Sequence, residues 1–180
     1  MSDTFKMTIA GLERDLPLCA VSDKLDIAAF ILFGDVEITV AAAKELLKKV
    51  PAFDYIVTPE AKSIPLAYEM SRQSGKPYFV ARKGMKVYMR DPVHVDVHSI
   101  TTLNTQTLYL DGTEGRQMNG KRVLIVDDVI STGESLAATE KLVEQFDCEI
   151  VAKCAVLAEG EAADRDDIVY LEKLPLFFKD

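Results

Sequence analysis

The sequence predicts an α/β fold with an open, mainly parallel sheet flanked by helices. Short apolar runs alternate along most of the chain with segments whose apolar residues recur at helical spacing. The run at 123–126 is β-branched and apolar throughout, as expected of a strand buried on both faces. Strands that alternate with helices are joined by crossovers, and crossovers make neighbouring strands parallel.

The elements of the first half follow from local signals. A helix is expected at 40–50, where the apolar spacing is helical and Pro51 should end it. A buried strand is expected at 55–57. A second helix at 64–72 should end at the break formed by residues 74–75.

The second half continues the alternation. Residues 82–105 show no clear period, and residues 111–112 should form a turn. A helix is expected at 132–146, with one apolar side. The remaining short apolar runs are strand candidates, at 78–81, 107–110, 123–126, 150–157 and 168–170.

Domain organisation is expected to be simple. Residues 1–36 do not fit the alternation and should form a small hood or edge segment, with residues 37–180 as the core of the same single domain. A chain of 180 residues falls within the usual size of one domain.

Composition and charge exclude several classes of protein. The net charge of −8 argues against a nucleic-acid binder, which needs a basic surface. The cysteines (Cys19, Cys148 and Cys154) are odd in number and form no CxxC pair, so neither a disulfide framework nor a structural zinc site is expected. The first sixteen residues are too polar for a signal peptide, and the apolar run at 27–33 is too short to span a bilayer. A cytoplasmic protein without a membrane partner is expected.

The segment VLIVDDVISTGES at 123–135 concentrates the chemistry. Asp127 and Asp128 follow the apolar run, and carboxylates accept hydrogen bonds from vicinal sugar hydroxyls. Ser131, Thr132 and Gly133 then lead into a helix, whose free N–H groups suit a phosphate. A ribose 5-phosphate site is therefore predicted. Ordinary helix capping is the plainer alternative, and neither a Walker A loop nor GxGxxG is present.

This segment resembles the phosphoribosyl pyrophosphate (PRPP) motif of type I phosphoribosyltransferases. Residues 58–63 resemble the short pyrophosphate loop of that family, and residues 64–84 resemble its adenine branch. The resemblance covers roughly residues 37–157. It implies a core parallel sheet, a flexible loop, an N-terminal hood, and PRPP with Mg²⁺ as substrate.

The resemblance also implies roles for individual residues. Asp127 and Asp128 would be the catalytic pair that holds the ribose hydroxyls. Glu60, Ala61 and Lys62 would contact pyrophosphate, in a loop that often carries a non-proline cis peptide in relatives. The 5-phosphate would be bound by Val129, Ile130, Ser131, Thr132, Gly133, Glu134 and Ser135.

A basic cluster follows the strand candidate at 78–81. Arg82, Lys83, Lys86 and Arg90 crowd together in an otherwise acidic chain, and the first three are predicted to neutralise pyrophosphate. A solvated basic face is the alternative. Tyr88 lies among them and is either a gate for the flexible loop or a packed side chain.

Three departures from the family pattern bear on the base. Residues 99–104 carry no acid where adenine enzymes usually have a loop glutamate. Ser131 stands where common hypoxanthine-guanine enzymes have an aspartate. Glu134 replaces a small residue, so its side chain should point away from the phosphate. His94, Asp96 and His98 share one face of a strand, and a solvent-exposed face is expected there rather than a metal site.

The sequence is therefore interpreted as a purine phosphoribosyltransferase that forms a nucleoside 5-monophosphate and pyrophosphate, with adenine as the favoured base. The alternatives are hypoxanthine, guanine or xanthine as the base, or a regulator that senses PRPP without catalysis. Leu25, Ile27 and Phe30 could line an apolar slot for the base, although a plain hydrophobic core explains them as well. A homodimer is expected from the resemblance.

Overall fold

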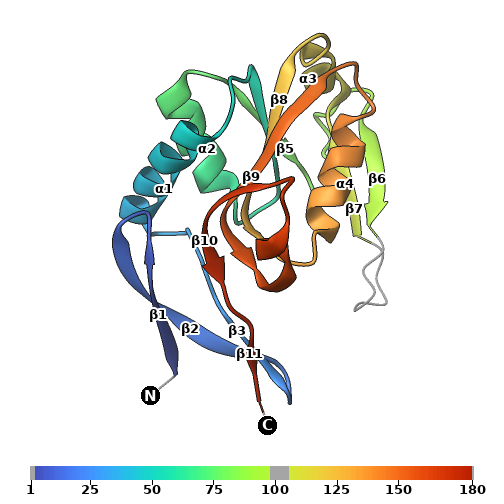
Figure 1. Cartoon of the computed structure of the whole chain (residues 1–180). Coiled ribbons are helices and arrows are strands. Elements are labelled where there is room, and N and C mark those ends of the chain that lie inside the picture. The colour runs from blue at the N-terminus through green and yellow to red at the C-terminus, as the bar shows by residue number, and fades with distance from the viewer. Residues whose placement is uncertain (1–2, 98–105, 180) are drawn as a thin grey trace.

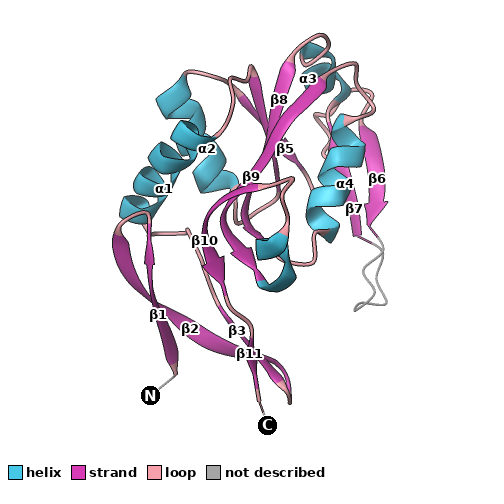
Figure 2. Cartoon of the chain, viewed as in Figure 1, coloured by secondary structure: helices cyan, strands magenta, loops and turns pink. Residues whose placement is uncertain are grey.

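The centre of the fold is a five-stranded parallel sheet in the order β10–β9–β8–β4–β5 (Figures 1 and 2). The computed structural model describes residues 3–97 and 106–179. The predicted α/β class with a parallel sheet is confirmed. The strands are β4 (Tyr55–Pro59), β5 (Tyr78–Ala81), β8 (Arg122–Ile130), β9 (Glu149–Glu159) and β10 (Val169–Leu174).

Both faces of this sheet are buried, as β8 illustrates. Leu124 and Val126 belong to the core under α1 (Val36–Lys49) and α2 (Ile64–Ser74). Val123 and Ile125 belong to the core under α4 (Glu134–Val143). Figure 1 shows α1 and α2 on one side of the sheet and α4 on the other. Continuous apolar character in the sequence therefore reflects two cores that share one strand.

The ends of α1 and α2 coincide with capping residues or with a proline. The Asp35 side chain accepts a hydrogen bond of 3.1 Å from the Ile38 N–H and caps α1, which ends before Pro51. Gly75 adopts a left-handed conformation (φ 70°) and ends α2. The helix predicted at 132–146 is shorter than expected, because α4 begins at Glu134 and ends at Val143.

One predicted turn is wrong. Residues 111–112 begin a helix, α3 (Gly112–Gln117), because the Asp111 side chain accepts a hydrogen bond of 2.7 Å from the Thr113 N–H and caps it. Gly115 lies directly against the Phe146 ring, where no Cβ would fit. This close approach holds α3 against the segment that follows α4.

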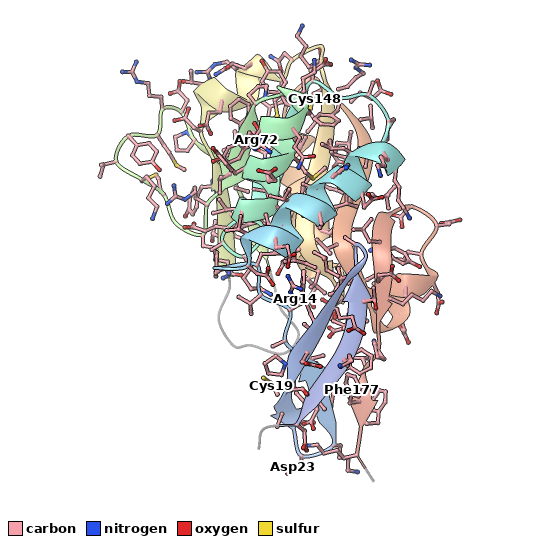
Figure 3. The ribbon with its side chains drawn as sticks, turned by 90° about the vertical axis from the view of Figure 1, so that its left-hand side faces the viewer. Arg14, Cys19, Asp23, Arg72, Cys148 and Phe177 are labelled. Atoms are coloured by element: carbon pink, nitrogen blue, oxygen red, sulfur yellow. The ribbon has the colours of Figure 1, made fainter. Side chains whose placement is uncertain are left out.

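The N-terminal segment forms a second, antiparallel sheet in the order β1–β2–β3–β11. Its strands are β1 (Thr4–Ile9), β2 (Leu12–Ser22), β3 (Leu25–Ala28) and β11 (Phe177–Phe178). The last strand comes from the other end of the chain, which no pattern in the sequence predicts. In Figure 3, Arg14 lies where this sheet meets α1, and its guanidinium pairs with Asp35 at 2.7 Å and with Glu37 at 2.8 Å.

A two-stranded antiparallel sheet, β6 (Val93–Val97) and β7 (Gln106–Leu110), lies beside α4 (Figure 1). Arg82 and Tyr109 bridge β7 to the end of β5. A short 3₁₀ helix, η1 (Gly160–Asp164), follows β9. Within residues 3–97 and 106–179, none of the helices combines the length and the apolar character needed to cross a membrane.

Candidate active site

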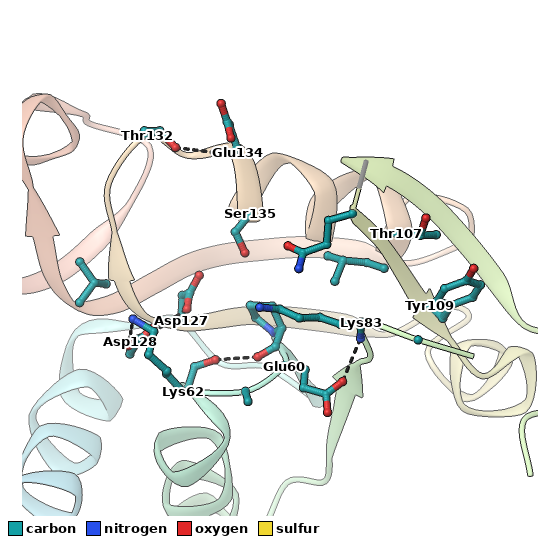
Figure 4. A pocket seen from close by; sticks show the side chains of 17 residues that line it. Glu60, Lys62, Lys83, Thr107, Tyr109, Asp127, Asp128, Thr132, Glu134 and Ser135 are labelled. Carbon is teal, nitrogen blue, oxygen red and sulfur yellow. Dashed lines mark hydrogen bonds and ion pairs between the residues drawn. The ribbon is translucent and has the colours of Figure 1, made fainter. Parts of the chain in front are cut away.

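A cleft of about 1000 Å³ opens at the carboxyl ends of β4, β5 and β8 (Figure 4). This is the edge where ligands bind in open parallel sheets. The cleft is lined by Pro59, Glu60, Ala61, Lys62, Ser63, Lys83, Gly84, Gln106, Thr107, Leu108, Tyr109, Asp127, Asp128, Val129, Thr132, Glu134 and Ser135.

The paired carboxylates lie within β8, not after it as the sequence suggested, because the strand continues through them to Ile130. Asp127 is 8% exposed and Asp128 is 3% exposed. The Asp128 N–H donates a hydrogen bond of 2.8 Å to Asp127 Oδ1. Burial, together with the negative charge of Asp128, raises the pKa of the Asp127 carboxyl well above its usual value. The site therefore holds an acidic group, Asp127, in an environment that disfavours its ionised form.

The loop between β8 and α4, predicted to bind the 5-phosphate, leads directly into the N-terminus of α4. Gly133 adopts a left-handed conformation (φ 82°) at the start of α4, which few residues other than glycine accept. Ser135 in the first turn of α4 points toward Asp127 in Figure 4. Glu134 points the opposite way, as expected if a phosphate is to bind here. Ser131 and Thr132 are exposed.

The predicted pyrophosphate loop lies on the facing side of the cleft. The peptide bond between Glu60 and Ala61 is cis, as the family resemblance implied. Lys62 Nζ lies 3.1 Å from Asp128 Oδ2. The Lys62 side chain is 52% exposed whereas that of Asp128 is 5% exposed, so a solvent-facing cation caps a buried anion.

Buried hydroxyl groups hold the base of this loop against β8. Thr58 donates a hydrogen bond of 2.7 Å to the Val126 carbonyl, and Thr58 Oγ1 lies 2.7 Å from Ser63 Oγ. The Ser63 hydroxyl donates in turn to the Pro59 carbonyl at 2.9 Å. Thr58 and Ser63 are fully buried, and their bonds fix the loop relative to the strand that carries the carboxylates.

The basic cluster reaches the cleft only in part. Lys83 lines the cleft, whereas Arg82 and Lys86 are not among the lining residues. Arg82 Nε donates to Glu60 Oε2 at 3.2 Å, and its Nη1 donates to the Tyr88 hydroxyl at 2.7 Å. Burial raises the pKa of the Glu60 carboxyl, but hydrogen bonds from the Lys83 N–H and from Arg82 outweigh it and lower the pKa below its usual value. Glu60 thus stays ionised and holds Arg82 in place.

A second cavity of about 680 Å³ adjoins the main cleft and shares Thr132 with it. Leu25 and Ile27, the predicted base contacts, line neither cavity. They lie on β3, where Leu25 pairs directly with Phe178 across the N-terminal sheet. Phe30 is buried in the main core. The second cavity is lined by Ser131, Thr132, Glu159, Gly160, Glu161, Ala162, Asp164, Arg165, Leu176 and Phe178.

The sequence predicts an exposed face rather than a metal site on β6, and a following stretch without an acid. Asp96 accepts a hydrogen bond of 2.7 Å from the Thr107 hydroxyl, and the His94 ring lies 5.7 Å from that of Tyr109. His98 and the stretch 99–104 without an acid lie outside the described residues. Within residues 3–97 and 106–179, no group of three or more His, Cys, Asp or Glu could hold a metal ion.

Sequence reasoning missed the contribution of β7. Thr107, Leu108 and Tyr109 line the cleft because β7 passes beside the end of β5, where the backbones of Arg82 and Tyr109 exchange two hydrogen bonds of 2.8 Å. The alternation at 107–110 predicted the strand, but its position depends on a pairing between segments 27 residues apart. No local signal indicates such a pairing.

A parallel sheet with buried paired carboxylates and a cleft at its carboxyl edge places the chain among the open-sheet α/β proteins, which bind ligands at the strand ends. The chain belongs to the phosphoribosyltransferase family, since residues 36–174 match the model of the phosphoribosyl transferase domain.

Relatives found by sequence include hypoxanthine/guanine enzymes of that family. The chain is 40% identical over 112 residues to a hypoxanthine/guanine phosphoribosyltransferase of Methanococcus voltae, and 39% identical over 107 residues to one of Methanocella arvoryzae. The matches cover 62% and 59% of this chain and 56% and 52% of those proteins, so the chain spans about half the length of these relatives.

Solved structures similar to this chain include adenine phosphoribosyltransferases. The one from Thermoanaerobacter pseudethanolicus has a TM-score of 0.68 at 19% identity, with 95% of both chains covered. The one from Saccharomyces cerevisiae, determined with adenine, has a TM-score of 0.64 at 19% identity, with 94% of this chain and 92% of that chain covered. At this identity the likeness concerns the fold, and it includes the N-terminal segment.

Proposed function

We propose that this chain is a purine phosphoribosyltransferase, which transfers the 5-phosphoribosyl group of PRPP to a purine. One observation carries the proposal: the paired carboxylates of β8, the glycine-containing loop before α4 and the loop at 60–62 all face one cleft. Their spacing suits a sugar whose hydroxyls, 5-phosphate and leaving group must be held at the same time.

The reaction breaks the bond between C1 of the ribose and the pyrophosphate oxygen, and pyrophosphate leaves with the electron pair. A ring nitrogen of the base forms the new bond to C1. Positive charge develops on the sugar ring during the displacement, and the carboxylates of Asp127 and Asp128 are suited to stabilise it while they orient the hydroxyls. The protein needs no nucleophile of its own.

Lys62 links the two halves of the cleft. Its ammonium group pairs with Asp128 at 3.1 Å, which compensates a buried negative charge. A lysine that is half exposed can change partners, so we propose that PRPP attracts Lys62 to its pyrophosphate and frees Asp128 for the ribose hydroxyls. Lys83 lies on the same side of the cleft and adds a second cation for the leaving group.

Magnesium fits this site as an ion that arrives with the substrate. Mg²⁺ usually binds one or two carboxylates together with substrate phosphates and water, and does not require a cage of protein ligands. The cleft carries two adjacent carboxylates, Asp127 and Asp128, beside the loop proposed for pyrophosphate. When bound, the ion would neutralise charge on the departing pyrophosphate.

The second cavity is the proposed place of the base. It shares Thr132 with the main cleft, so a base there would lie beside the loop between β8 and α4. Leu176 and Phe178 supply apolar and aromatic surface, and Glu159 supplies a carboxylate that is 8% exposed. A carboxylate acceptor suits the N–H and amino groups of a purine edge.

Two candidates remain for the purine base that this chain would use. Hypoxanthine or guanine is supported by relatives that are 39–40% identical and carry that name. Adenine, favoured by the resemblance of residues 64–84, is the second candidate. The adenine enzymes among solved structures are 19% identical and support the fold of the site more than its specificity.

A homodimer is the proposed assembly. Met85, Val87 and Tyr88, which alternate with the residues of the basic cluster, are 65%, 105% and 63% exposed. A second copy of the chain that covers them would bring its own basic cluster close to this cleft. Sedimentation equilibrium is expected to give twice the chain mass, and Val87→Asp should shift it to the monomer. A monomeric wild-type protein would contradict this assembly.

The decisive experiment is turnover of PRPP and Mg²⁺ with adenine, hypoxanthine, guanine and xanthine, followed by pyrophosphate release. Asp127→Asn serves as the control variant, because it preserves the shape of the site. Product with any base supports the enzyme, and the base with the highest kcat/KM identifies its branch. PRPP binding without product from any of the four bases would favour a PRPP-sensing regulator instead.

A further inference from the structure

Arg165 lies against the phosphate loop, although it is 30 residues beyond the end of the motif. A Cβ placed on Gly133 would come within 2.8 Å of Arg165 Nη1. The guanidinium therefore occupies the space that any side chain at Gly133 would need. Arg165 also lines the second cavity together with Ser131 and Thr132, which are the two residues before that glycine.

A chain of ion pairs fixes the direction of this guanidinium. Arg165 Nε and Nη2 donate to the two carboxylate oxygens of Asp167, at 2.8 Å and 2.7 Å. Lys153 on β9 donates to Asp167 Oδ2 at 2.8 Å. It also donates to Glu140 Oε1 on α4, at 2.8 Å.

This arrangement ties the segment after η1 to the helix that the phosphate loop begins. Two carboxylates and two cations alternate in this network of ion pairs, so it carries no net charge. Within residues 3–97 and 106–179, Nη1 of Arg165 donates no hydrogen bond, and this nitrogen is the one that faces Gly133. A guanidinium nitrogen with free donor capacity, at the cationic end of the network, is therefore directed at the loop.

We propose that Arg165 is a positioning residue of the 5-phosphate site. It acts through Gly133, whose left-handed turn it supports from outside, and its charge favours an anion on the other side of the loop. This inference rests on the proposed function, since it assumes that the loop binds the 5-phosphate. Arg165 lies outside the PRPP motif at 123–135, so the motif alone does not assign it to the site.

The test compares each purine nucleoside 5-monophosphate with its nucleoside, by calorimetric titration. The ratio of the two dissociation constants isolates the phosphate. Arg165→Met should reduce that ratio by about 5- to 30-fold. Arg165 also lines the second cavity, but any effect there should weaken nucleoside and monophosphate alike and cancel in the ratio. Arg165→Lys retains the charge without the two-point hold on Asp167, and should recover part of the loss.

Two further variants make the test specific. Lys173→Met removes one positive charge from an exposed pair with Asp164 (3.6 Å) and should leave the ratio as in wild type. Asp167→Asn keeps the arginine but weakens its hold, so it should reduce the ratio by about 2- to 5-fold even if Arg165→Met does not fold. Circular dichroism establishes that each titrated variant is folded.

The outcomes separate the inference from the function on which it rests. Wild-type protein that binds nucleoside as tightly as monophosphate would contradict the phosphate site itself. If wild type prefers the monophosphate and folded Arg165→Met or Asp167→Asn keeps that preference, the role of Arg165 is refuted. Equal losses for nucleoside and monophosphate would also refute it, because they indicate a general effect on the fold.

Discussion

Asp127→Asn should make the protein more stable and less active at the same time. The Asp127 carboxyl is 8% exposed and lies beside Asp128, which is 3% exposed. Its pKa is raised by burial and by the charge of its neighbour, so the folded state binds the Asp127 proton more tightly than the unfolded state does. The amide has the same shape, carries no charge and can still accept the hydrogen bond from the Asp128 N–H.

The sign of the pH dependence follows from the raised pKa. Below the unfolded-state pKa of about 3.9, both states are protonated and the carboxyl costs the fold little. As pH rises toward and through the folded pKa, the unfolded state loses its proton more readily and stability falls. We expect the variant to gain about 1–2 kcal/mol in unfolding free energy at pH 7, the usual range for a poorly compensated buried group. That gain corresponds to about 2–8 °C in Tm.

Urea denaturation at pH 7 and near pH 4, with EDTA present, measures the difference between variant and wild type. Glu172→Gln removes an exposed carboxylate from the neighbouring β10 and should change stability little at either pH. A loss of stability at pH 7, or a gain that is the same at both pH values, would refute the reasoning. The same Asp127→Asn protein should lose about 10- to 150-fold in kcat/KM for PRPP.

Three other variants test the remaining parts of the site. Replacing Arg82, Lys83 and Lys86 by alanine should weaken PRPP and pyrophosphate far more than nucleoside monophosphate in equilibrium binding, and equal losses would indicate a structural role. Thr132→Val should reduce the difference in binding free energy between monophosphate and nucleoside by about 1–3 kcal/mol in calorimetry. An unchanged difference would show that the Thr132 hydroxyl does not bind the phosphate. Gly133→Ala should lower the unfolding free energy by about 1–2 kcal/mol in urea denaturation, because φ at Gly133 is 82° and the new Cβ would meet Arg165. Unaltered stability would mean that the backbone at residue 133 adjusts to the alanine without cost.

The parallel core was predictable because its signals are local. Pro51 and Gly75 end α1 and α2 as expected, and the apolar run at 123–126 lies in a strand with a core on each face. Crossover topology then requires few further choices. The boundaries were less well predicted, because Asp127 and Asp128 read as a strand end although the ladder to β9 continues past them to Ile130.

The N-terminal sheet could be predicted only in part. Phe5, Met7 and Ile9 alternate before the turn at residues 10–11, where both φ values are positive, and such a pattern is typical of a tight hairpin. Nothing local indicates that Phe178 pairs with Leu25, because that ladder joins the two ends of the chain. Pairings of such sequence separation are fixed by the packed tertiary structure and not by propensity.

The candidate site divides in the same way. The motif at 123–135 could be recognised because several residue types suited to a sugar phosphate fall together in one short segment. The side chains that reach the site from elsewhere carry no such signature: Tyr109 reaches it through a neighbouring ladder, and Arg165 through contact with a glycine. Sequence reasoning therefore finds the residues proposed to touch the sugar phosphate and misses those that support them.

Electrostatic compensation explains why the support residues are charged. Asp127 and Asp128 are buried in a chain of net charge −8, and a site for an anionic substrate would be poorly formed without cations placed by the fold. Lys62 supplies one at the carboxylates, at 3.1 Å from Asp128, and Arg165 supplies another behind Gly133. Each is oriented by an acidic partner, and each leaves donors that face the cleft or its loop. Arg165 is thus held in place before a ligand binds, whereas Lys62, half exposed, is the cation proposed to change its partner when an anion binds.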